Sequence, residues 1–312
     1  MDLKIGVMGG SGLGSLLGEQ GGRRHEIETP FGRPSDAITE VEWEGLSVFL
    51  LSRHGAGHLL NPSMVPFRAN IFALKQLGCT HVIASGAVGS LREEFRPRDL
   101  VIPDQVIDKT HKRANTFYEK AAVHVEFAEP FCPVLRQILM EAGHGHPSTD
   151  AHATPDSGAS LYQVHGRGCY VCMEGAAFSS RAESLMHRLW GGDLIGMTAM
   201  PEAKLAREAE MSYAIVALVT DYDCWRNKPA GQAGEAEKSK DELLKEIIGN
   251  LAAATQNAME VIRGAIRLLA ERRGSLPESP AHSALRLGIW SEKGRIDGEE
   301  VKRLAPLWMK YF

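Results

Sequence analysis

The stretch Ala217-Leu218-Val219-Thr220-Asp221-Tyr222-Asp223-Cys224-Trp225 carries an apolar strand directly into two carboxylates that are one residue apart, and then into an aromatic side chain. Two carboxylates at a strand end can accept hydrogen bonds from a heterocycle that has several N–H groups, such as a purine. Partial burial can raise the pKa of such a carboxyl until it shares or donates a proton. The alternative is an aspartate-rich turn that caps the following helix.

The same order of strand, polar turn and helix is found on the N-terminal side of this stretch. Apolar patterns predict strands over residues 3–8, 46–52, 80–84, 100–103, 170–173, 194–197 and 213–220. The alternation with helices predicts an α/β fold in which a central mixed β-sheet is flanked by helices. Ligands of such a sheet are expected at the carboxyl ends of its strands.

Helices are predicted from their capping and turn residues. Asn61-Pro62 supplies a favoured N-cap and a first-turn proline, and Ser180 with Glu183 forms a capping box. Further helices are expected over residues 202–210 and, after a loop rich in glycine, alanine, glutamate and lysine, over residues 241–271.

The length and composition fit a compact protein that binds small molecules. The chain has 312 residues, 44% of them hydrophobic, so it can bury one large core or two modest ones. We expect one domain over residues 1–276 and a C-terminal tail over 277–312 that packs on it or on a neighbouring subunit. A formal charge of -4 without basic runs argues against a nucleic-acid partner. Without a signal-peptide pattern or a membrane-spanning apolar run, the sequence predicts no membrane partner and a cytoplasmic location.

The cysteines are sparse for a chain of this length, which fits a reducing compartment. Cys169 and Cys172 have the CxxC spacing of redox and zinc sites, but no second CxxC motif or spaced histidine pair accompanies them. Buried structural thiols are therefore the favoured interpretation. The five cysteines are Cys79, Cys132, Cys169, Cys172 and Cys224.

The glycine-rich segment from Gly9 to Gly14 follows the first predicted strand. It has neither the GxGxxG spacing nor the lysine of a P-loop, and Ser11 is not centred in a GxSxG motif, so dinucleotide, ATP and hydrolase interpretations weaken. A nest of backbone N–H groups that binds an anion, with the hydroxyl of Ser11, remains. A plain tight turn is the alternative.

Arg53 and His54 follow the second long strand and are the better anion-binding candidates. A guanidinium offers donors in a fork, and an imidazole adds a further donor. His54 and His58 are four residues apart, but Gly55 and Gly57 argue against the helix that a metal site of this spacing would need. We therefore expect no metal, and a surface salt bridge is the alternative role for Arg53.

Several motifs together resemble the methylthioadenosine phosphorylases of the trimeric purine nucleoside phosphorylase family. The resemblance covers residues 3–225 and implies the α/β fold of that family, with a single nucleoside phosphorylase domain. The motifs are Ile5-Gly-Val-Met-Gly-Gly-Ser-Gly, Thr29-Pro-Phe-Gly-Arg-Pro-Ser-Asp36, Arg53-His54-Gly55, Phe67-Arg-Ala-Asn70, Gly89-Ser-Leu-Arg-Glu-Glu94, Ala128-Glu-Pro-Phe-Cys-Pro133, Phe178-Ser-Ser-Arg-Ala-Glu-Ser184, Gly196-Met-Thr198 and Thr220-Asp-Tyr-Asp-Cys-Trp225.

The resemblance implies a reaction in which inorganic phosphate attacks C1′ of a 6-aminopurine nucleoside, giving the free base and a sugar 1-phosphate. Phosphate is then a co-substrate, and no cofactor or metal is implied. Asp221 would serve N7 of the base, and Asp223 would recognise the 6-amino group. His124 would reach into the site of a neighbouring subunit, which implies a homotrimer.

The resemblance also assigns the other contacts of the two substrates. Phosphate would be bound by Ser11, Arg53, His54, the backbone of Ala87, and Thr198. The nucleoside would be bound by Met197 against the ribose, Phe178 against the base, and Ser179 nearby.

Three departures from the family pattern bear on affinity and 5′ specificity. Ala176-Ala177 stands where the family has proline and arginine, and Ser85-Gly86 stands where it has a threonine pair. The loop before the long helix, which in relatives lies against the 5′ group, here contains Lys238 and Lys240. An inward lysine would favour a polar 5′ substituent, whereas lysines in solvent leave methylthioadenosine as the expected substrate.

Three other functions stay open at this point. The protein could be a phosphorylase for 5′-deoxyadenosine or adenosine, or a catalytically weak nucleoside-binding protein that has lost phosphate handling. A hydrolase that uses water in place of phosphate is the third, and Arg53, His54 and Thr198 argue against it.

Overall fold

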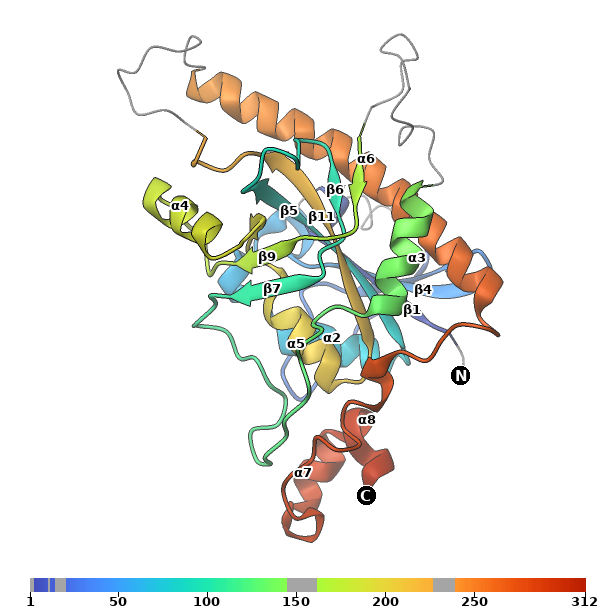
Figure 1. Cartoon of the computed structure of the whole chain (residues 1–312). Coiled ribbons are helices and arrows are strands. Elements are labelled where there is room, and N and C mark those ends of the chain that lie inside the picture. Colours follow the sequence, from blue (N-terminus) through green and yellow to red (C-terminus); the bar gives the residue numbers. More distant parts are fainter. Residues whose placement is uncertain (1–2, 11, 15–20, 145–161, 227–238) are drawn as a thin grey trace.

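The computed structural model describes residues 3–10, 12–14, 21–144, 162–226 and 239–312, and its centre is one mixed β-sheet (Figure 1). Eleven strands pair into this sheet within those residues. They are β1 (Ile5–Gly9), β2 (Arg23–His25), β3 (Ile38–Trp43), β4 (Leu46–Ser52), β5 (His81–Ser90), β6 (Leu100–Val101), β7 (Gln105–Asp108), β8 (Val164–His165), β9 (Cys169–Cys172), β10 (Leu194–Gly196) and β11 (Ser212–Asp221). The predicted α/β fold with a central mixed sheet is confirmed.

The central strands of the sheet are parallel, and β5 pairs with both β1 and β11. β4, β1, β5 and β11 pair in parallel, with Ile5 opposite Val48 and His81, and with Ser212 opposite His81. Their carboxyl ends therefore point the same way, as expected for a sheet that binds ligands at that edge.

A split in the sheet opens beside the second half of β5. β1 pairs with β5 only as far as Ala84, and antiparallel β10 pairs on the same edge only at Gly89 and Ser90, because β11 fills the opposite edge. The segment from Ser85 to Val88 thus lies between the end of β1 and the end of β10. This topology brings the residues after Gly9 and those after Gly196 to the same part of β5.

Helices cover both faces of the sheet (Figure 1). Helices α3 and α6 pack together on one face, and α2 and α5 pack together on the other. The described helices are α2 (Phe67–Gln76), α3 (Pro133–His144), α4 (Arg181–Leu189), α5 (Ala199–Glu208), α6 (Lys240–Arg272), α7 (Gly298–Arg303) and α8 (Ala305–Trp308), with short 3-10 turns η1 (Ala56–His58), η2 (Pro62–Met64), η5 (Pro280–Ser283), η6 (Lys293–Arg295) and η7 (Met309–Tyr311).

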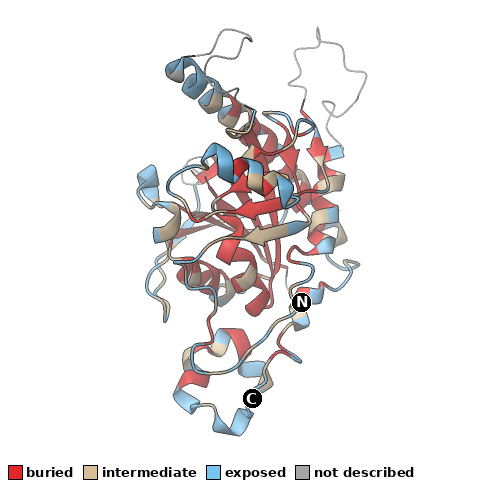
Figure 2. Ribbon diagram, turned by 60° about the vertical axis from the view of Figure 1, so that its left-hand side comes forward, coloured by how far each residue is buried: buried red, intermediate tan, exposed pale blue. Residues whose placement is uncertain are grey.

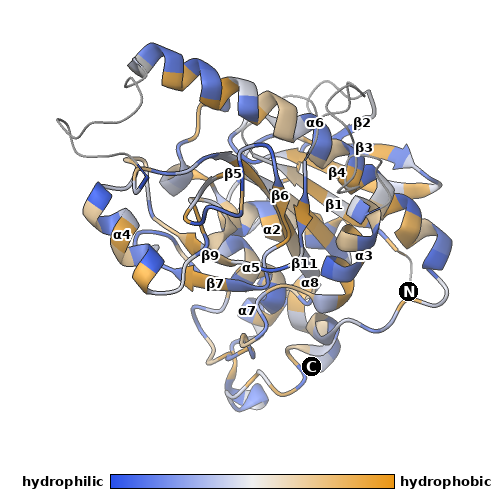
Figure 3. Ribbon diagram, turned by 45° about the horizontal axis from the view of Figure 1, so that its top comes forward, coloured by the Kyte–Doolittle hydropathy of each residue, from blue (hydrophilic) through white to orange (hydrophobic). Residues whose placement is uncertain are grey.

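The side chains of β11 show why this strand is apolar throughout. Tyr213 and Ile215 join the core on the α2 and α5 face, whereas Ala214 and Val216 join the core on the α3 and α6 face. A strand that is buried on both faces needs apolar residues at every position. The central strands of the sheet are accordingly buried and mostly hydrophobic, while the N-terminal turns of α6 are exposed (Figures 2 and 3).

The C-terminal tail packs on the same body as the sheet. Leu285, Leu304 and Trp308 belong to the core cluster of α2 and α5, and the rings of Trp308 and Tyr118 lie 4.8 Å apart. The predicted division into a domain and a tail between residues 276 and 277 stays a prediction. Helix α6 ends at Arg272, and the chain that follows it packs on the same core cluster.

Three predicted boundaries differ from the structure. The strand predicted to end at Ala84 continues to Ser90, because β11 pairs with β5 along almost all of its length. Asn61 caps the short turn η2, and α2 begins only at Phe67, since Pro66 interrupts the helical hydrogen bonds. Helix α5 begins at Ala199, earlier than the predicted Glu202. By contrast, the capping box of Ser180 and the long helix α6 are confirmed.

The cysteines are all free thiols, and Cys79, Cys132 and Cys172 are buried. The predicted burial is thus confirmed for Cys172, whereas Cys169 is only half-buried. Among the described residues, none of the helices has the length and apolar character needed to cross a membrane.

Candidate active site

Arg53, at the end of β4, is completely buried against Glu202 of α5. Its Nε and Nη2 donate to the two carboxylate oxygens of Glu202, the second over 3.0 Å, and Nη1 donates to the carbonyl of Ser85 over 2.7 Å. Tyr213 adds its hydroxyl to the same carboxylate at 2.9 Å. A buried charge needs such a paired, hydrogen-bonded environment. The alternative of a surface salt bridge is therefore wrong.

The guanidinium of Arg53 still has donors to offer. Of its five N–H groups, three are used by Glu202 and Ser85 among the described residues, which leaves two. A Cβ atom on Gly10 would lie 2.6 Å from Nη1, so the glycine-rich segment after β1 passes directly beside this cation. Ser11, the predicted phosphate ligand of that segment, lies outside the described residues.

Two buried hydroxyl groups, one from β5 and one from the segment after β10, have no protein partner among the described residues. Ser85 Oγ and Thr198 Oγ1 are inaccessible to solvent, and neither makes a hydrogen bond among the described residues. A Cβ atom on Gly86 would lie 2.9 Å from Thr198 Oγ1, so glycine at this position permits the close approach. Because an unpaired buried hydroxyl is costly, we expect Thr198 Oγ1 to bind a ligand oxygen atom. The split in the sheet therefore offers a site for an oxyanion.

His54 is an acceptor in this site. Its Nδ1 lies 2.7 Å from the carbonyl of Leu60, which can only accept, so Nδ1 carries the proton. Burial lowers the pKa of His54 to about 4, although the bond to Leu60 opposes the shift. The ring is then neutral at pH 7, and Nε2 has a free lone pair that can accept a hydrogen bond from a phosphate or sugar hydroxyl.

The histidine pair does not have the arrangement of a metal site. The ring of His58 stacks on that of His54 with centroids 4.2 Å apart, and the turn between them is interrupted at Gly57. Within the ranges that the structure describes, no group of three or more histidine, cysteine, aspartate or glutamate side chains could hold a metal ion.

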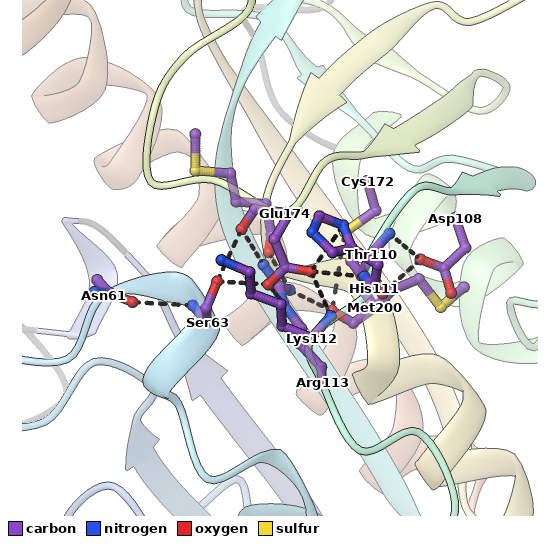
Figure 4. Close-up of polar contacts among 11 residues, drawn as sticks. Asn61, Ser63, Asp108, Thr110, His111, Lys112, Arg113, Cys172, Glu174 and Met200 are labelled. Carbon is purple, nitrogen blue, oxygen red and sulfur yellow. Dashed lines mark hydrogen bonds and ion pairs between the residues drawn. The ribbon is translucent and has the colours of Figure 1, made fainter.

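A buried ion pair between Arg113 and Glu174, which the sequence analysis missed, holds the backbone on both sides of Thr198 (Figure 4). The side chain of Arg113 is 1% exposed, and its Nη1 donates to the carbonyls of Met197 and Met200 at 2.6 Å each. Its Nε donates to Glu174 Oε1 over 3.1 Å, and its Nη2 donates to the Glu174 carbonyl over 2.6 Å. The pair therefore fixes the backbone between β10 and α5.

Glu174 accepts hydrogen bonds from two segments that are far from it in the sequence (Figure 4). Besides Arg113, its carboxylate accepts from the hydroxyl of Ser63 and from the backbone N–H groups of His111 and Lys112. Burial alone would raise the pKa of Glu174, but these hydrogen bonds lower it to about 2. The carboxylate is therefore ionised at pH 7.

The two carboxylates at the end of β11 lie beside the carboxyl-terminal part of β5, farther along this strand than the oxyanion site. Asp221 pairs with Gly89, whereas the oxyanion site lies at Gly86, three residues earlier along the strand. At about 3.3 Å per residue, the two positions are about 10 Å apart. Ala87, the predicted backbone ligand of phosphate, is half-buried between them.

Asp221 and Asp223 differ in their hydrogen bonds. Asp221 Oδ2 accepts from the hydroxyl of Thr220 at 2.6 Å, and its Oδ1 accepts from the backbone N–H of Asp223 at 2.7 Å. Asp223 Oδ2 is buried and has no partner among the described residues, and burial raises the pKa of Asp223. The two carboxyls thus have different environments, as expected if they have different roles.

The remaining predicted nucleoside contacts are only partly brought together. Ser179 is half-buried, and its carbonyl accepts from the thiol of Cys224 at 3.3 Å, beside Asp223. Phe178 is 85% exposed on the segment before α4. His124 is exposed, and its backbone N–H donates to Gly288, away from the residues of this site.

The loop lysines of the sequence analysis cannot be placed against this site. Lys238 lies outside the described residues, and Lys240 begins α6 with a side chain that is likewise outside them.

Comparison with known proteins identifies the family. Residues 4–267 match the family model of the phosphorylase superfamily. The chain is 44% identical over 310 residues to the S-methyl-5′-thioadenosine phosphorylase of Chloroflexus aurantiacus, covering 99% of this chain and 98% of that protein. It is 43% identical over 306 residues to the enzyme of the same name from Geobacter sulfurreducens, covering 97% of each chain.

A solved structure agrees with these relatives. The crystal structure of a methylthioadenosine phosphorylase from an antarctic soil metagenomic library superposes with a TM-score of 0.83 at 43% identity, covering 98% of this chain and 99% of that chain. The chain therefore belongs to the methylthioadenosine phosphorylase family of the phosphorylase superfamily.

Proposed function

We propose that this protein cleaves the N-glycosidic bond of 5′-methylthioadenosine with inorganic phosphate, giving adenine and 5-methylthioribose 1-phosphate. One observation carries the proposal: an oxyanion site at Ser85 and Gly86 and a pair of carboxylates at Gly89 lie about 10 Å apart along β5. That spacing leaves room for a ribose between a phosphate and a purine. Membership of the methylthioadenosine phosphorylase family supports the same reaction.

Phosphate binds in the split of the sheet. Arg53 donates two N–H groups to it, Thr198 donates its hydroxyl, and His54 accepts its remaining hydroxyl at Nε2. Ser11 and the backbone of Ala87 complete the site by family resemblance. In this environment the phosphate oxygen is held beneath C1′ and stabilises the positive charge that the sugar develops.

The base departs toward the carboxylate pair. The C1′–N9 bond breaks as the phosphate oxygen forms its bond to C1′, and the electron pair passes to the purine. Asp221 accepts a hydrogen bond from protonated N7 or supplies its proton, and Asp223 accepts from the 6-amino group. Met197, Phe178 and Ser179 contact the ribose and the base.

The requirement for phosphate is the first test of this proposal. Because Arg53 keeps two N–H groups and Thr198 has a buried hydroxyl without a protein partner in the described chain, we expect adenine release from methylthioadenosine only when phosphate is present. Release can be followed by chromatography in phosphate buffer and in a phosphate-free buffer of equal ionic strength. Equal rates in both buffers would indicate a hydrolase, and no release in either would indicate a nucleoside-binding protein.

The same assay can compare three adenine nucleosides as substrates. Methylthioadenosine, 5′-deoxyadenosine and adenosine differ only at the 5′ position, so their kcat/KM values rank the 5′ substituent directly. We expect methylthioadenosine to rank first, as the names of the relatives indicate.

A homotrimer is part of the proposal, because His124 does not reach the site of its own chain. In the described residues, its ring lies 4.6 Å from that of Trp290, at the surface near the C-terminal tail. Leu287 and Trp290 expose 78% and 70% of their surface beside it, which suits burial against a second copy. We expect active protein to have the mass of three chains by native mass spectrometry. A monomer with full activity at assay concentration would contradict this.

We further propose a cytoplasmic location, since free thiols fit a reducing compartment. Cell fractionation tests it, and recovery of the protein only from an oxidising compartment would contradict it.

A further inference from the structure

Two unpaired polar atoms are buried in the half of the site that faces the base. Ser184 Oγ and Asp223 Oδ2 are both inaccessible to solvent, and neither has a hydrogen-bond partner among the described residues. Ser184 lies one turn into α4, where its backbone N–H donates to Ser180 at 3.0 Å, and its whole side chain is buried. Neither atom is explained by the packing of the fold, because an unpaired buried hydroxyl or carboxylate destabilises it.

The two atoms are neighbours. Burial is the largest influence on Asp223 and raises its pKa, and the hydroxyl of Ser184 is the next largest and lowers it. The same hydroxyl lowers the pKa of the adjacent thiol of Cys224. That thiol donates to the carbonyl of Ser179, just before α4, over 3.3 Å, so the start of α4 and the segment after β11 are in contact beside these buried polar groups.

We propose that Ser184 is a positioning residue that sets base specificity: its hydroxyl donates to Asp223 Oδ2, keeps this carboxyl ionised, and turns the other oxygen toward the 6-amino group of the base. The inference rests on the proposed function and adds a residue to it. Ser184 acts through Asp223 and touches neither the sugar nor phosphate.

The protonation state of Asp223 decides which base fits. An ionised carboxylate can only accept, so it pairs with the 6-amino group of adenine, whereas a protonated carboxyl can donate to the 6-oxo group of hypoxanthine. Because Asp223 is buried, a donor is needed to hold it in the ionised form. Among the donors that lower the pKa of Asp223, the hydroxyl of Ser184 has the largest influence, ahead of the backbone N–H of Cys224.

Few other charged groups face Asp223. Asp221, on the same segment, opposes its ionisation through like charge, and the hydroxyl of Ser179 favours it. The thiol of Cys224 is adjacent, and Arg181 from the start of α4 lies near that thiol. In the described part of the chain, the largest influences on the pKa of Asp223 include no lysine or arginine.

The test is the pH dependence of base choice in Ser184→Ala. The measurement is kcat/KM from pH 5 to pH 8 for methylthioadenosine and for methylthioinosine, which carry the same 5′ group. Loss of the donor raises the pKa of Asp223, so the acid limb for methylthioadenosine should move up by about one pH unit. The ratio of methylthioinosine to methylthioadenosine activity should rise about tenfold, most strongly at low pH, where Asp223 is protonated.

Three further variants separate this role from packing. Ser184→Cys keeps the volume but is a weak donor and should behave like Ser184→Ala, whereas Ser184→Thr keeps the hydroxyl and should restore the wild-type limb. Ser180→Ala removes the N-cap of α4 but leaves the Ser184 hydroxyl, and should lower stability without moving the limb. An unchanged limb and base ratio in Ser184→Ala, or an equal shift in Ser180→Ala, would overturn the inference.

A direct titration distinguishes this inference from the proposed function. The carboxyl carbon of Asp223 can be followed by 13C NMR in wild type and Ser184→Ala, with no substrate present. A higher midpoint in the variant supports the inference even if the wild type does not cleave methylthioadenosine. An identical midpoint refutes it even if cleavage is observed.

Discussion

Replacing Arg53 by methionine is expected to lower the free energy of unfolding by about 3–5 kcal/mol, because Glu202 would then be a buried carboxylate without its counter-charge. The same change removes the two N–H groups that we assign to phosphate, and a single preorganised donor group is typically worth about 10²–10³ in rate. Thermal or urea unfolding measures the first effect, and kcat/KM for phosphate measures the second. Both effects follow from one side chain that is fully buried.

A double variant separates the two effects. In Arg53→Met with Glu202→Gln, the buried charge is gone and the Tyr213 hydroxyl can still donate to an amide oxygen, so most of the lost stability should return. Phosphate binding should not return. Recovery of activity along with stability would show that Arg53 only balances Glu202 and does not bind phosphate.

Arg33 offers a matched control at the surface. It pairs with Glu28, but the two side chains are 75% and 66% exposed. Because exposed ion pairs contribute about 0–1 kcal/mol, Arg33→Met should change stability and activity little. If Arg33→Met lowered stability or activity as much as Arg53→Met, burial would not explain the large effect expected at Arg53.

The end of β11 could be predicted because its signal is local. A continuous apolar run that ends in Asp221 and Asp223 indicates a buried strand that presents carboxylates at its carboxyl end, and the structure has this arrangement. The helix at Ser180 was equally accessible, since a capping box needs only residues three apart.

The environment of Arg53 could not be predicted in the same way. Its partner Glu202 is 149 residues away along the chain, and a glutamate in the first turn of a helix is ordinarily a solvated residue. Only the pairing of β4, β1, β5 and β11 brings the two together, and nothing in the local pattern of either residue shows it.

Arg113 was missed for a similar reason. It follows Asp108, Thr110 and two basic residues, a polar run that indicates an exposed loop, yet its side chain is almost completely buried. Besides the carboxylate of Glu174, its partners are backbone carbonyls at Met197, Met200 and Glu174, which any residue type could supply. The residue types at these positions therefore do not indicate that a buried arginine binds their carbonyl groups.

Only part of the site could be predicted from the sequence, because β5 extends further than its local pattern indicates. Ser85, Gly86 and Gly89 indicate a turn when they are considered locally, because small and polar residues are favoured there. In the structure they continue a strand, where glycine lets Thr198 approach the backbone from the antiparallel side. The polar groups of the site thus lie along a strand rather than after it.

Replacing Asp223 by asparagine should reverse the preference between 6-amino and 6-oxopurines. Ser184 is proposed to donate to the buried Oδ2 of Asp223, which leaves the other carboxyl oxygen to pair with the base. An amide can present its NH₂ group to a 6-oxo group, whereas a carboxylate can only accept. Each unpaired polar contact costs on the order of 1–3 kcal/mol, so the ratio of kcat/KM for methylthioadenosine and methylthioinosine should change by roughly 10²–10⁴.

Asp221→Ala is the matched control for this reversal, since Asp221 is the neighbouring carboxylate and is proposed to serve N7, which both bases share. Its removal should lower kcat for the two nucleosides by similar factors, because charge develops at N7 whichever base departs. The contrast has a structural basis: both oxygens of Asp221 already accept hydrogen bonds from Thr220 and Asp223, whereas the Oδ2 atom of Asp223 accepts none within the described chain. If Asp223→Asn leaves the base preference unchanged while Asp221→Ala alters it, the roles of the two carboxylates are the reverse of those proposed, and Asp221 reads the 6-position of the base.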